Sequence, residues 1–155
     1  MTGLRISWAK HSYEVALKCM EIAEVLGYGE EVCEEFFMVG LIHDSARLLP
    51  GVEQVKHETI AGNIFKRMGL KYSDAIARHD QDVTDEAQMI LIMADLTTGP
   101  NGERLTLKER LIDISKRYGE GTIQTENSKK VAESLKVFMK TNSKYIKLDY
   151  ILGDD

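Results

Sequence analysis

Residues 39–44 form the stretch Val39-Gly40-Leu41-Ile42-His43-Asp44, in which an apolar helical run ends in a histidine next to an aspartate. An imidazole beside a carboxylate at the end of a buried segment is costly to bury unless a metal ion or a hydrogen-bond network holds it. We therefore take His43 and Asp44 as the first place to look for chemistry.

All four histidines of the chain fall on the apolar faces of predicted helices. His11 lies at helical spacing from Val15 and Cys19, and similar patterns of three- and four-residue steps contain the other three, His43, His57 and His79. A single histidine in such a position is usually an ordinary core residue. Four of them, with none on a polar face, predict that the imidazoles converge on one site.

Length and cysteine usage indicate one self-sufficient domain. A chain of 155 residues can bury roughly 70% of the surface that it exposes when unfolded, so we expect residues 1–155 to form a single domain. Cys19 and Cys33 lack any metal-binding spacing, which predicts free thiols in a reducing compartment. We therefore do not expect thiolate ligands.

Charge and hydropathy narrow the range of partners. Residues 1–10 contain no apolar signal core, and the longest apolar run, residues 87–94, is far shorter than a membrane span. The sequence thus predicts a cytoplasmic protein with no membrane partner. A net charge of −5 argues against binding to a nucleic acid polymer, whereas a small phosphorylated ligand needs only local positive charge.

Helical periodicity dominates the chain and predicts an all-α bundle of about six to eight helices. Glycine and proline separate the helical patterns, which cover about 8–26, 30–44, 55–68, 73–79, 84–98, 106–118 and 126–142. Thr106 with Glu109 forms a capping-box pattern at the start of one of them. Residues 145–152 fit either a strand or a helix, and we favour a helix.

Two further patterns make specific packing predictions. Gly40 and Gly62 lie inside helical segments, where glycine costs about 1 kcal/mol relative to alanine, and we attribute both to a close approach between helices. Residues 87–94 are apolar on almost every side, which is typical of a fully buried helix. Asp95 is the charge that ends this run.

The ionisable residues on the inward faces occur in a recognisable order, with "KHSYEVA" around His11, "GLIHDSARLL" around the His43-Asp44 doublet, "HETIAG" at His57 and "MADLTTG" at Asp95. This series resembles the HD-domain superfamily of metal-dependent phosphohydrolases, and the similarity extends over about residues 8–118. The resemblance implies an HD-like helical bundle around a buried metal site, and we expect the helices of residues 119–155 to pack on it.

The resemblance also implies a ligand set. His11, His43, Asp44 and Asp95 together offer imidazole nitrogens and carboxylate oxygens, which suit a divalent transition metal such as Mn, Fe, Co, Ni or Zn. Adjacent helical residues point about 100° apart, so His43 and Asp44 can share one ion only where the helix ends.

His57 and His79 leave the number of ions open. A subset of the family carries two extra histidines at a dinuclear centre, and in that arrangement Asp44 would bridge two ions. Alternatively, one or both histidines contact substrate phosphate, or donate a proton to the leaving group, beside a single ion. The sequence leaves both interpretations open.

Three more residues are candidates for supporting roles. Arg47 stands where the family often carries a basic residue, and its guanidinium can bind phosphate through two hydrogen bonds, although an ion pair with a carboxylate explains it nearly as well. Glu58 and Asp80, each beside a histidine, can orient a metal ligand or can be solvated helix residues.

The leading functional prediction is a metal-dependent phosphohydrolase acting on a small phosphorylated compound, with nucleotides as the first class to test. "ARHDQDVTDEAQ" lacks the glycine and the spacing expected of relatives that cleave dinucleoside tetraphosphates. The alternatives are a di-iron oxygenase of the same superfamily and a metal-binding sensor or interaction protein without turnover. The sequence leaves the oligomeric state open.

Overall fold

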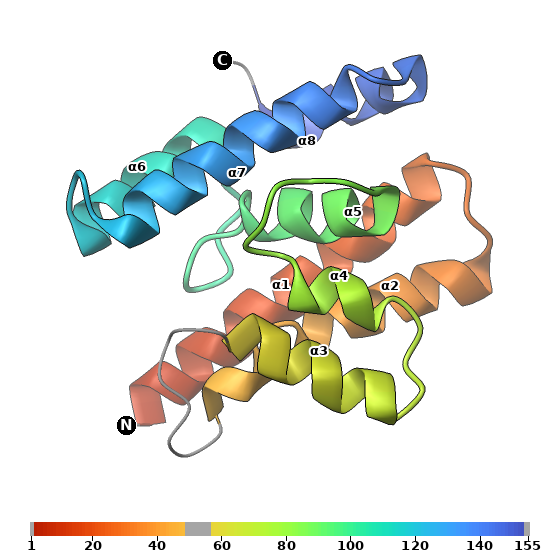
Figure 1. Ribbon diagram of the computed structural model, residues 1–155, viewed down its shortest axis with the longest axis horizontal. Coiled ribbons are helices and arrows are strands. Elements are labelled where there is room, and N and C mark those ends of the chain that lie inside the picture. The colour runs from red at the N-terminus through yellow and green to blue at the C-terminus, as the bar shows by residue number, and fades with distance from the viewer. Residues whose placement is uncertain (1, 49–56, 154–155) are drawn as a thin grey trace.

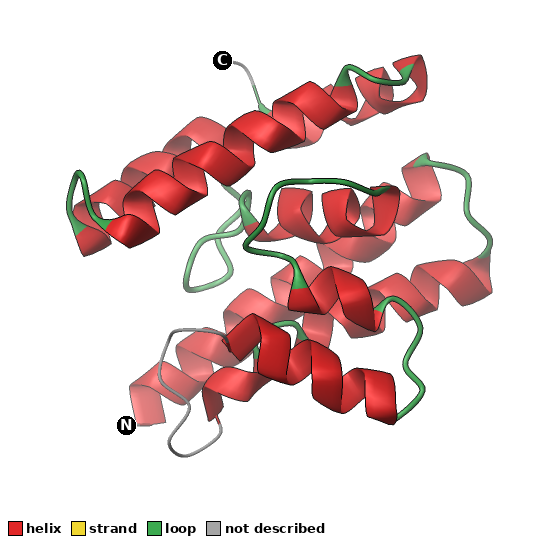
Figure 2. Ribbon diagram, in the orientation of Figure 1, coloured by secondary structure: helices red, strands yellow, loops and turns green. Residues whose placement is uncertain are grey.

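A computed structural model describes residues 2–48 and 57–153, except for the side chains of residues 2–5, 47, 48 and 57. Over these residues it contains eight α-helices, two short 3₁₀-helices and no strands (Figures 1 and 2), which confirms the all-α prediction. In chain order they are α1 (Thr2–Val25), α2 (Glu30–Ile42), η1 (Ser45–Leu48), α3 (His57–Arg67), α4 (Ser73–Ala77), α5 (Glu86–Asp95), α6 (Leu107–Tyr118), α7 (Ile123–Met139), η2 (Ser143–Leu148) and α8 (Asp149–Leu152).

Two glycines set the distances between helix pairs at one end of the fold. α1 packs more extensively against α2 than any other two elements pack together, and a Cβ added to Gly40 would lie 2.7 Å from the Ala16 Cα. A Cβ at Gly62 would lie 2.4 Å from the Cβ of Ala77 in α4. Both predictions of a close helix approach are thus confirmed.

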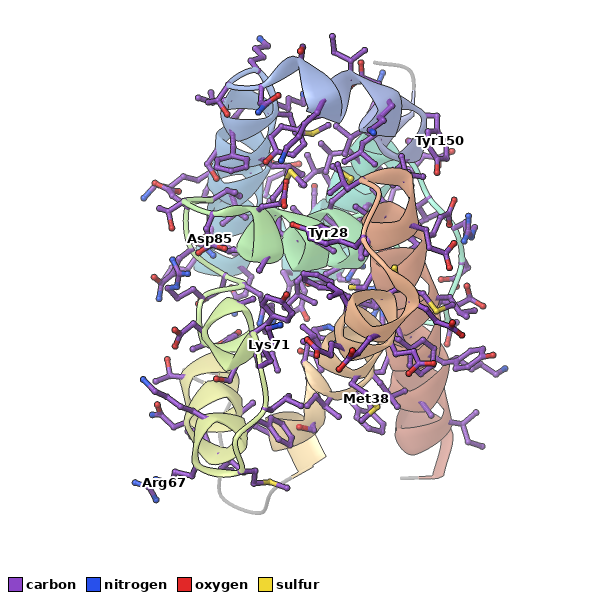
Figure 3. All side chains as sticks on the ribbon, turned by 90° about the vertical axis from the view of Figure 1, so that its right-hand side faces the viewer. Tyr28, Met38, Arg67, Lys71, Asp85 and Tyr150 are labelled. Carbon is purple, nitrogen blue, oxygen red and sulfur yellow. The ribbon has the colours of Figure 1, made fainter. Side chains whose placement is uncertain are left out.

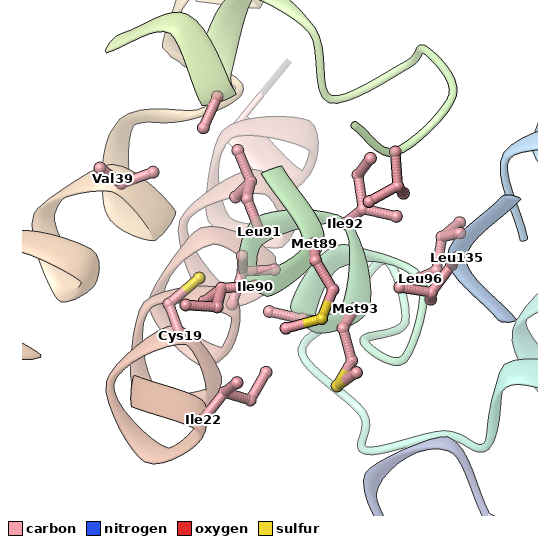
Figure 4. Close-up of a cluster of buried hydrophobic side chains, with 14 of the residues drawn as sticks. Cys19, Ile22, Val39, Met89, Ile90, Leu91, Ile92, Met93, Leu96 and Leu135 are labelled. Carbon is pink, nitrogen blue, oxygen red and sulfur yellow. The ribbon is translucent and has the colours of Figure 1, made fainter. Parts of the chain in front are cut away.

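α5 is the central helix of the bundle and contacts α1, α2, α4 and α7. Its residues 88–94 are all buried, as the apolar run predicts. Figure 4 shows the side chains from Met89 to Met93 radiating toward residues of other helices, among them Cys19, Val39 and Leu135. The C-terminal end of this helix carries Asp95, so the best-packed element of the fold holds one of the candidate ligands.

Polar contacts join the C-terminal elements to the rest of the fold. Glu86, in the first turn of α5, accepts hydrogen bonds from Tyr28 and from Tyr145 (2.9 Å) and pairs with Lys144 (2.7 Å). Tyr150 of α8, labelled with Tyr28 in Figure 3, donates a 3.0 Å hydrogen bond to Glu21 of α1. These contacts place η2 and α8 against α5 and α1.

The helix ends follow local side-chain chemistry. The capping box of α6 is present, with Thr106 and Glu109 each accepting from the backbone of the other. α5 ends at Asp95 instead of near residue 98, because the hydroxyls of Thr97 and Thr98 bind the carbonyls of Met93 and Ala94. The tail is helical, as predicted.

α7 begins earlier than periodicity indicates, at Ile123, because Thr122 is its N-cap and accepts a hydrogen bond from the backbone of Thr125. Cys19 and Cys33 are free and buried. Within the described ranges, no helix is both long and apolar enough to cross a bilayer.

Candidate metal centre

Two histidines and two aspartates meet where α1, the end of α2 and the end of α5 come together. His11 Nε2 lies 3.0 Å from Asp95 Oδ1 and 3.9 Å from Asp44 Oδ2. His43 Nε2 lies 3.5 Å from each of these two oxygens. The sequence predicted this grouping, although its members are far apart along the chain.

The helix end makes the His43-Asp44 doublet possible. α2 ends at Ile42, His43 is its C-cap, and the chain then turns into η1. Asp44 therefore leaves the helical path, and its Oδ2 reaches the Nε2 atom of His43 (3.5 Å). This is the departure from helical geometry that sharing one ion requires.

Backbone carbonyls orient three imidazole rings. His11 Nδ1 lies 2.8 Å from the Gly99 carbonyl, His43 Nδ1 lies 2.6 Å from that of Gly40, and His79 Nδ1 lies 2.7 Å from that of Ile76. Because a carbonyl oxygen can only accept, each Nδ1 carries the proton and donates it. In the neutral ring this leaves Nε2 unprotonated, which is the form that binds a metal. His11 Nε2 lies 3.0 Å from Asp95 Oδ1, and it donates to this carboxylate only while it is protonated, so a bound ion would take the place of that proton.

The environment of His43 fits an ion better than it fits an ordinary core histidine. This side chain is fully buried, yet its Nε2 has no hydrogen-bond partner. Such an atom carries a desolvation cost that coordination would remove. Metal–ligand bonds of about 2.1 Å place neighbouring ligand atoms about 3.0 Å apart in an octahedron and 3.4 Å apart in a tetrahedron. The measured separations of 3.0–3.9 Å lie in and slightly above this range.

The histidines and aspartates of the cluster shift one another's pKa values. Burial alone would lower the pKa of His11, but the hydrogen bond and the charge of Asp95 outweigh it, so this pKa is raised. Burial would likewise raise the pKa of Asp95, whereas its contacts with His11 and His43 hold that pKa well below the ordinary value. Asp95 is therefore a carboxylate throughout the physiological pH range, as a metal ligand must be.

A comparison with protein families agrees with this geometry. The HD-domain family matches residues 8–119, a span that contains every member of the cluster. The chain belongs to the HD-domain family. Searches of curated proteins and of solved structures gave no match. HD domains bind divalent metals, and the buried cluster of this HD domain is compatible with such an ion.

His79 extends the cluster on the other side of Asp44. Its Nε2 lies 3.7 Å from Asp44 Oδ1, so the two carboxylate oxygens of Asp44 face different histidines. A carboxylate in this position can bridge two ions. The ligand atoms of His43, His79 and Asp95 also lie within 4.8 Å of one another, which is close enough for His79 to face a ligand bound to a single ion.

A buried glutamine holds the loop that follows His79. The carboxamide of Gln88 donates to the carbonyls of Arg78 (2.8 Å) and Asp82 (3.0 Å) and accepts from the backbone of Thr84 (2.8 Å). Irregular backbone inside a protein needs such partners because it has no helical ones. Gln88 thereby fixes the segment that carries His79.

The remaining predicted residues fall into two groups. The side chains of Arg47, in η1, and His57, at the start of α3, lie outside the described part of the structure. Glu58 is buried at the beginning of α3. Asp80 is exposed, and its carbonyl accepts a 3.0 Å hydrogen bond from Asn127. This exposure favours the solvated interpretation of Asp80.

Sequence reasoning did not find the carbonyls that orient the rings. Those of Gly40 and Ile76 stand three residues before His43 and His79, at helix ends where carbonyls lack helical partners. This spacing is visible in the sequence and could have been used. The contact between His11 and Gly99 depends on the loop after α5 and carries no such local signal.

Proposed function

We propose that this HD domain is a metal-dependent phosphohydrolase that cleaves a small phosphorylated compound. The observation that carries the proposal is the meeting of His11, His43, Asp44 and Asp95 around the unpartnered Nε2 atom of His43. The chemistry that a divalent ion supplies in such a set is activation of water at neutral pH and neutralisation of charge on a phosphoryl oxygen.

Each residue then has a defined task. His11 and His43 present Nε2 to the ion while their Nδ1 protons stay on backbone carbonyls, so neither ring has to reorient. Asp44 and Asp95 supply two negative charges, which balance one divalent ion. Their side chains remain 12% and 21% exposed, whereas those of His11 and His43 are 8% and 0% exposed. Substrate would therefore approach from the side of the carboxylates.

The proposed substrate class follows from charge and from Arg47. An acidic chain with a metal ion at a carboxylate-lined opening favours a compact phosphate group over a polyanion. Arg47, three residues after Asp44 and within η1, is proposed to bind the phosphate through its guanidinium. Nucleotides are the first class to test. They carry one or more phosphates on a nucleoside, and the nucleoside is similar in size from one nucleotide to the next.

His79 has two proposed roles that one measurement separates. With Asp44 Oδ1 it forms half of a second metal site, or it contacts the phosphate bound to a single ion. In the first case, the His79→Ala substitution lowers the metal content of saturated protein from two ions to one. In the second case, the metal content stays at one ion while turnover falls.

The experiment that tests the function combines metal analysis with a substrate panel. Protein supplied with Mn, Fe, Co, Ni or Zn is assayed against nucleotides and other small phosphoesters. We expect hydrolysis with at least one metal, and loss of both metal and turnover in Asp44→Ala. The matched control is Glu133→Ala, which removes an exposed carboxylate on α7 and should change neither.

Other outcomes would replace the proposal. Full hydrolysis by Asp44→Ala would exclude a mechanism through this site. Two bound iron ions together with oxygen consumption on an organic substrate would identify the di-iron oxygenase. Tight metal binding without turnover across the whole panel would identify a metal-binding sensor or interaction protein.

A further inference from the structure

A groove between α6 and α7 is independent of the ligand cluster. The two helices follow each other through a short turn and lie side by side as an antiparallel pair (Figure 1). The groove has a volume of about 520 Å³, and its lining consists of Leu107, Lys108, Leu111, Ile112, Ser115, Lys116, Glu120, Lys129 and Lys136. The proposed hydrolysis uses none of these residues.

The floor of the groove is apolar. Leu107 is buried and Leu111 is partly buried against the core, whereas Ile112 remains 46% exposed. One exposed isoleucine on a protein surface needs no explanation. Here, however, the three side chains line one concavity, which is the shape that accepts apolar side chains from another helix.

The rim of the groove is basic. Lys108 and Lys116 of α6 and Lys129 and Lys136 of α7 line it together with one carboxylate, that of Glu120. Lys129 also lies 3.7 Å from Glu126, and Lys136 lies 3.7 Å from Glu133. Within the described residues, neither Lys108 nor Lys116 forms an ion pair. Lys129 pairs with Glu120 (2.9 Å), but both side chains are largely exposed, and such a pair contributes only about 0–1 kcal/mol. It can be exchanged for an ion pair with a partner at little cost.

The groove is positively charged, whereas the molecule as a whole is negatively charged. The chain carries a net charge of −5, so an extended polyanion such as a nucleic acid or an anionic membrane would be repelled by most of the surface. A short acidic segment would meet mainly the lysines of the groove, of which Lys108 and Lys116 form no ion pair within the described residues. A groove between two helices also has room for a single row of side chains. A bilayer surface cannot present such a row.

We propose that the groove between α6 and α7 binds an acidic amphipathic helix of a partner protein. Leucine-like side chains of that helix would lie on Leu111 and Ile112, above the buried Leu107, and flanking carboxylates would pair first with Lys108 and Lys116. Lys108 and Lys116 are eight residues apart, which corresponds to about 12 Å along α6. The partner would therefore carry acidic residues about two turns apart, with apolar residues between them.

The test is a selection from a library of displayed helical peptides against the complete protein. We expect the enriched peptides to combine an apolar stripe with flanking glutamates or aspartates. Binding of the purified peptides should weaken about tenfold or more with Ile112→Glu, and similarly with the Lys108→Glu, Lys116→Glu double variant. Fluorescence anisotropy measures the affinities, and circular dichroism verifies that each variant is folded.

Two matched controls make the result specific. Ile123 is 86% exposed and lies outside the groove, so Ile123→Glu should leave the affinity unchanged. The Lys130→Glu, Lys147→Glu double variant reverses two exposed charges elsewhere and should have little effect. A failure to enrich any peptide, or equal losses in the groove variants and the controls, would overturn the proposal.

Two further measurements exclude other occupants. Sedimentation of the protein alone should show no self-association through the groove. Self-association that Ile112→Glu abolishes would mean that a second copy of this chain is the occupant. Vesicles of phosphatidylglycerol should not bind the protein through these lysines. Either result would overturn the assignment to a partner helix, and neither depends on whether the metal centre hydrolyses phosphoesters.

Discussion

Lys18 of α1 donates a 3.0 Å hydrogen bond to the hydroxyl of Thr97, two residues after Asp95, and its ammonium also contacts the Thr97 carbonyl. The lysine side chain is almost completely buried. Its hydrogen-bond acceptors are neutral, so a charge is kept in the interior without a directly bonded counter-ion. Burial, followed by the charge of Arg104, lowers the pKa of Lys18 from 10.5 to about 8.

This arrangement predicts a pH-dependent stability difference between the wild type and Lys18→Met. Because the pKa is lower in the folded state, the unfolded chain binds more protons between about pH 8 and 10.5. The charged lysine therefore costs stability below pH 8, and the cost disappears as the pH rises through this window. We expect Lys18→Met to be at least as stable as the wild type at pH 7.

The stability advantage of Lys18→Met should shrink by roughly 2 kcal/mol between pH 7 and pH 9.5. Urea unfolding of both proteins across this range measures the difference. Because both proteins contain the same tyrosines and cysteines, the contributions of these residues to the pH dependence of stability cancel in the comparison. A difference that stays constant with pH would show that Lys18 does not titrate in this window.

Gly40→Ala should impair both packing and metal binding. The new Cβ would lie 2.7 Å from the Ala16 Cα, and relief of that contact requires α1 and α2 to separate. We expect a loss of about 1–3 kcal/mol in the free energy of unfolding. Metal affinity should fall as well, because the Gly40 carbonyl orients His43. Thermal unfolding and competition with a chelator measure the two effects.

The matched control is Gly29→Ala. An added Cβ at Gly29 meets nothing within 4 Å, and the φ of −71° suits alanine. This variant should retain the wild-type metal affinity. Equal behaviour of the two alanine variants would contradict the role assigned to Gly40.

Gln88→Leu should release the loop that carries His79. Leucine offers no partner to the carbonyls of Arg78 and Asp82, and leaves the part-buried polar groups that Gln88 binds without their hydrogen bonds. We expect a destabilisation of about 2–4 kcal/mol. Amide hydrogen exchange should accelerate in residues 78–84, and Gln124→Leu, an exposed change on α7, should leave the exchange unchanged.

Arg47→Ala separates phosphate binding from a surface ion pair. If Arg47 binds the phosphate, the variant keeps its metal but loses on the order of 10²-fold or more in kcat/KM. If Arg47 only pairs with a carboxylate, the loss is about 0–1 kcal/mol of stability with unchanged kinetics. Arg67→Ala, an exposed arginine near the end of α3 (Figure 3), is the control.

Much of the fold could be predicted from sequence because its signals are local. The capping box at Thr106 and the largely apolar run of residues 87–94 each specify one element without reference to the others. Gly40 and Gly62 could be assigned to close contacts because glycine inside a helix costs stability unless a neighbouring helix needs the space. The end of α5 was misplaced because the hydroxyls of Thr97 and Thr98 outcompete the helix there.

The candidate ligands could be predicted because their order along the chain is distinctive. What supports them could not, since it depends on contacts between distant residues. Lys18 stands on an apolar helix face, and nothing local shows that Thr97 completes its hydrogen bonds. The contacts of the Gln88 side chain with the loop of residues 78–84 become visible only when α4 and α5 are placed together.

His43 and His79 are each bonded to the carbonyl three residues earlier, at the end of their own helix. Fraying of that last turn would therefore release the ring, and an ion that holds the ring would in turn keep the turn closed. Ligand loss and helix fraying thus become a single event. The ends of α2 and α4, which are the weakest parts of most helices, would become as resistant to opening as the ion is to dissociation.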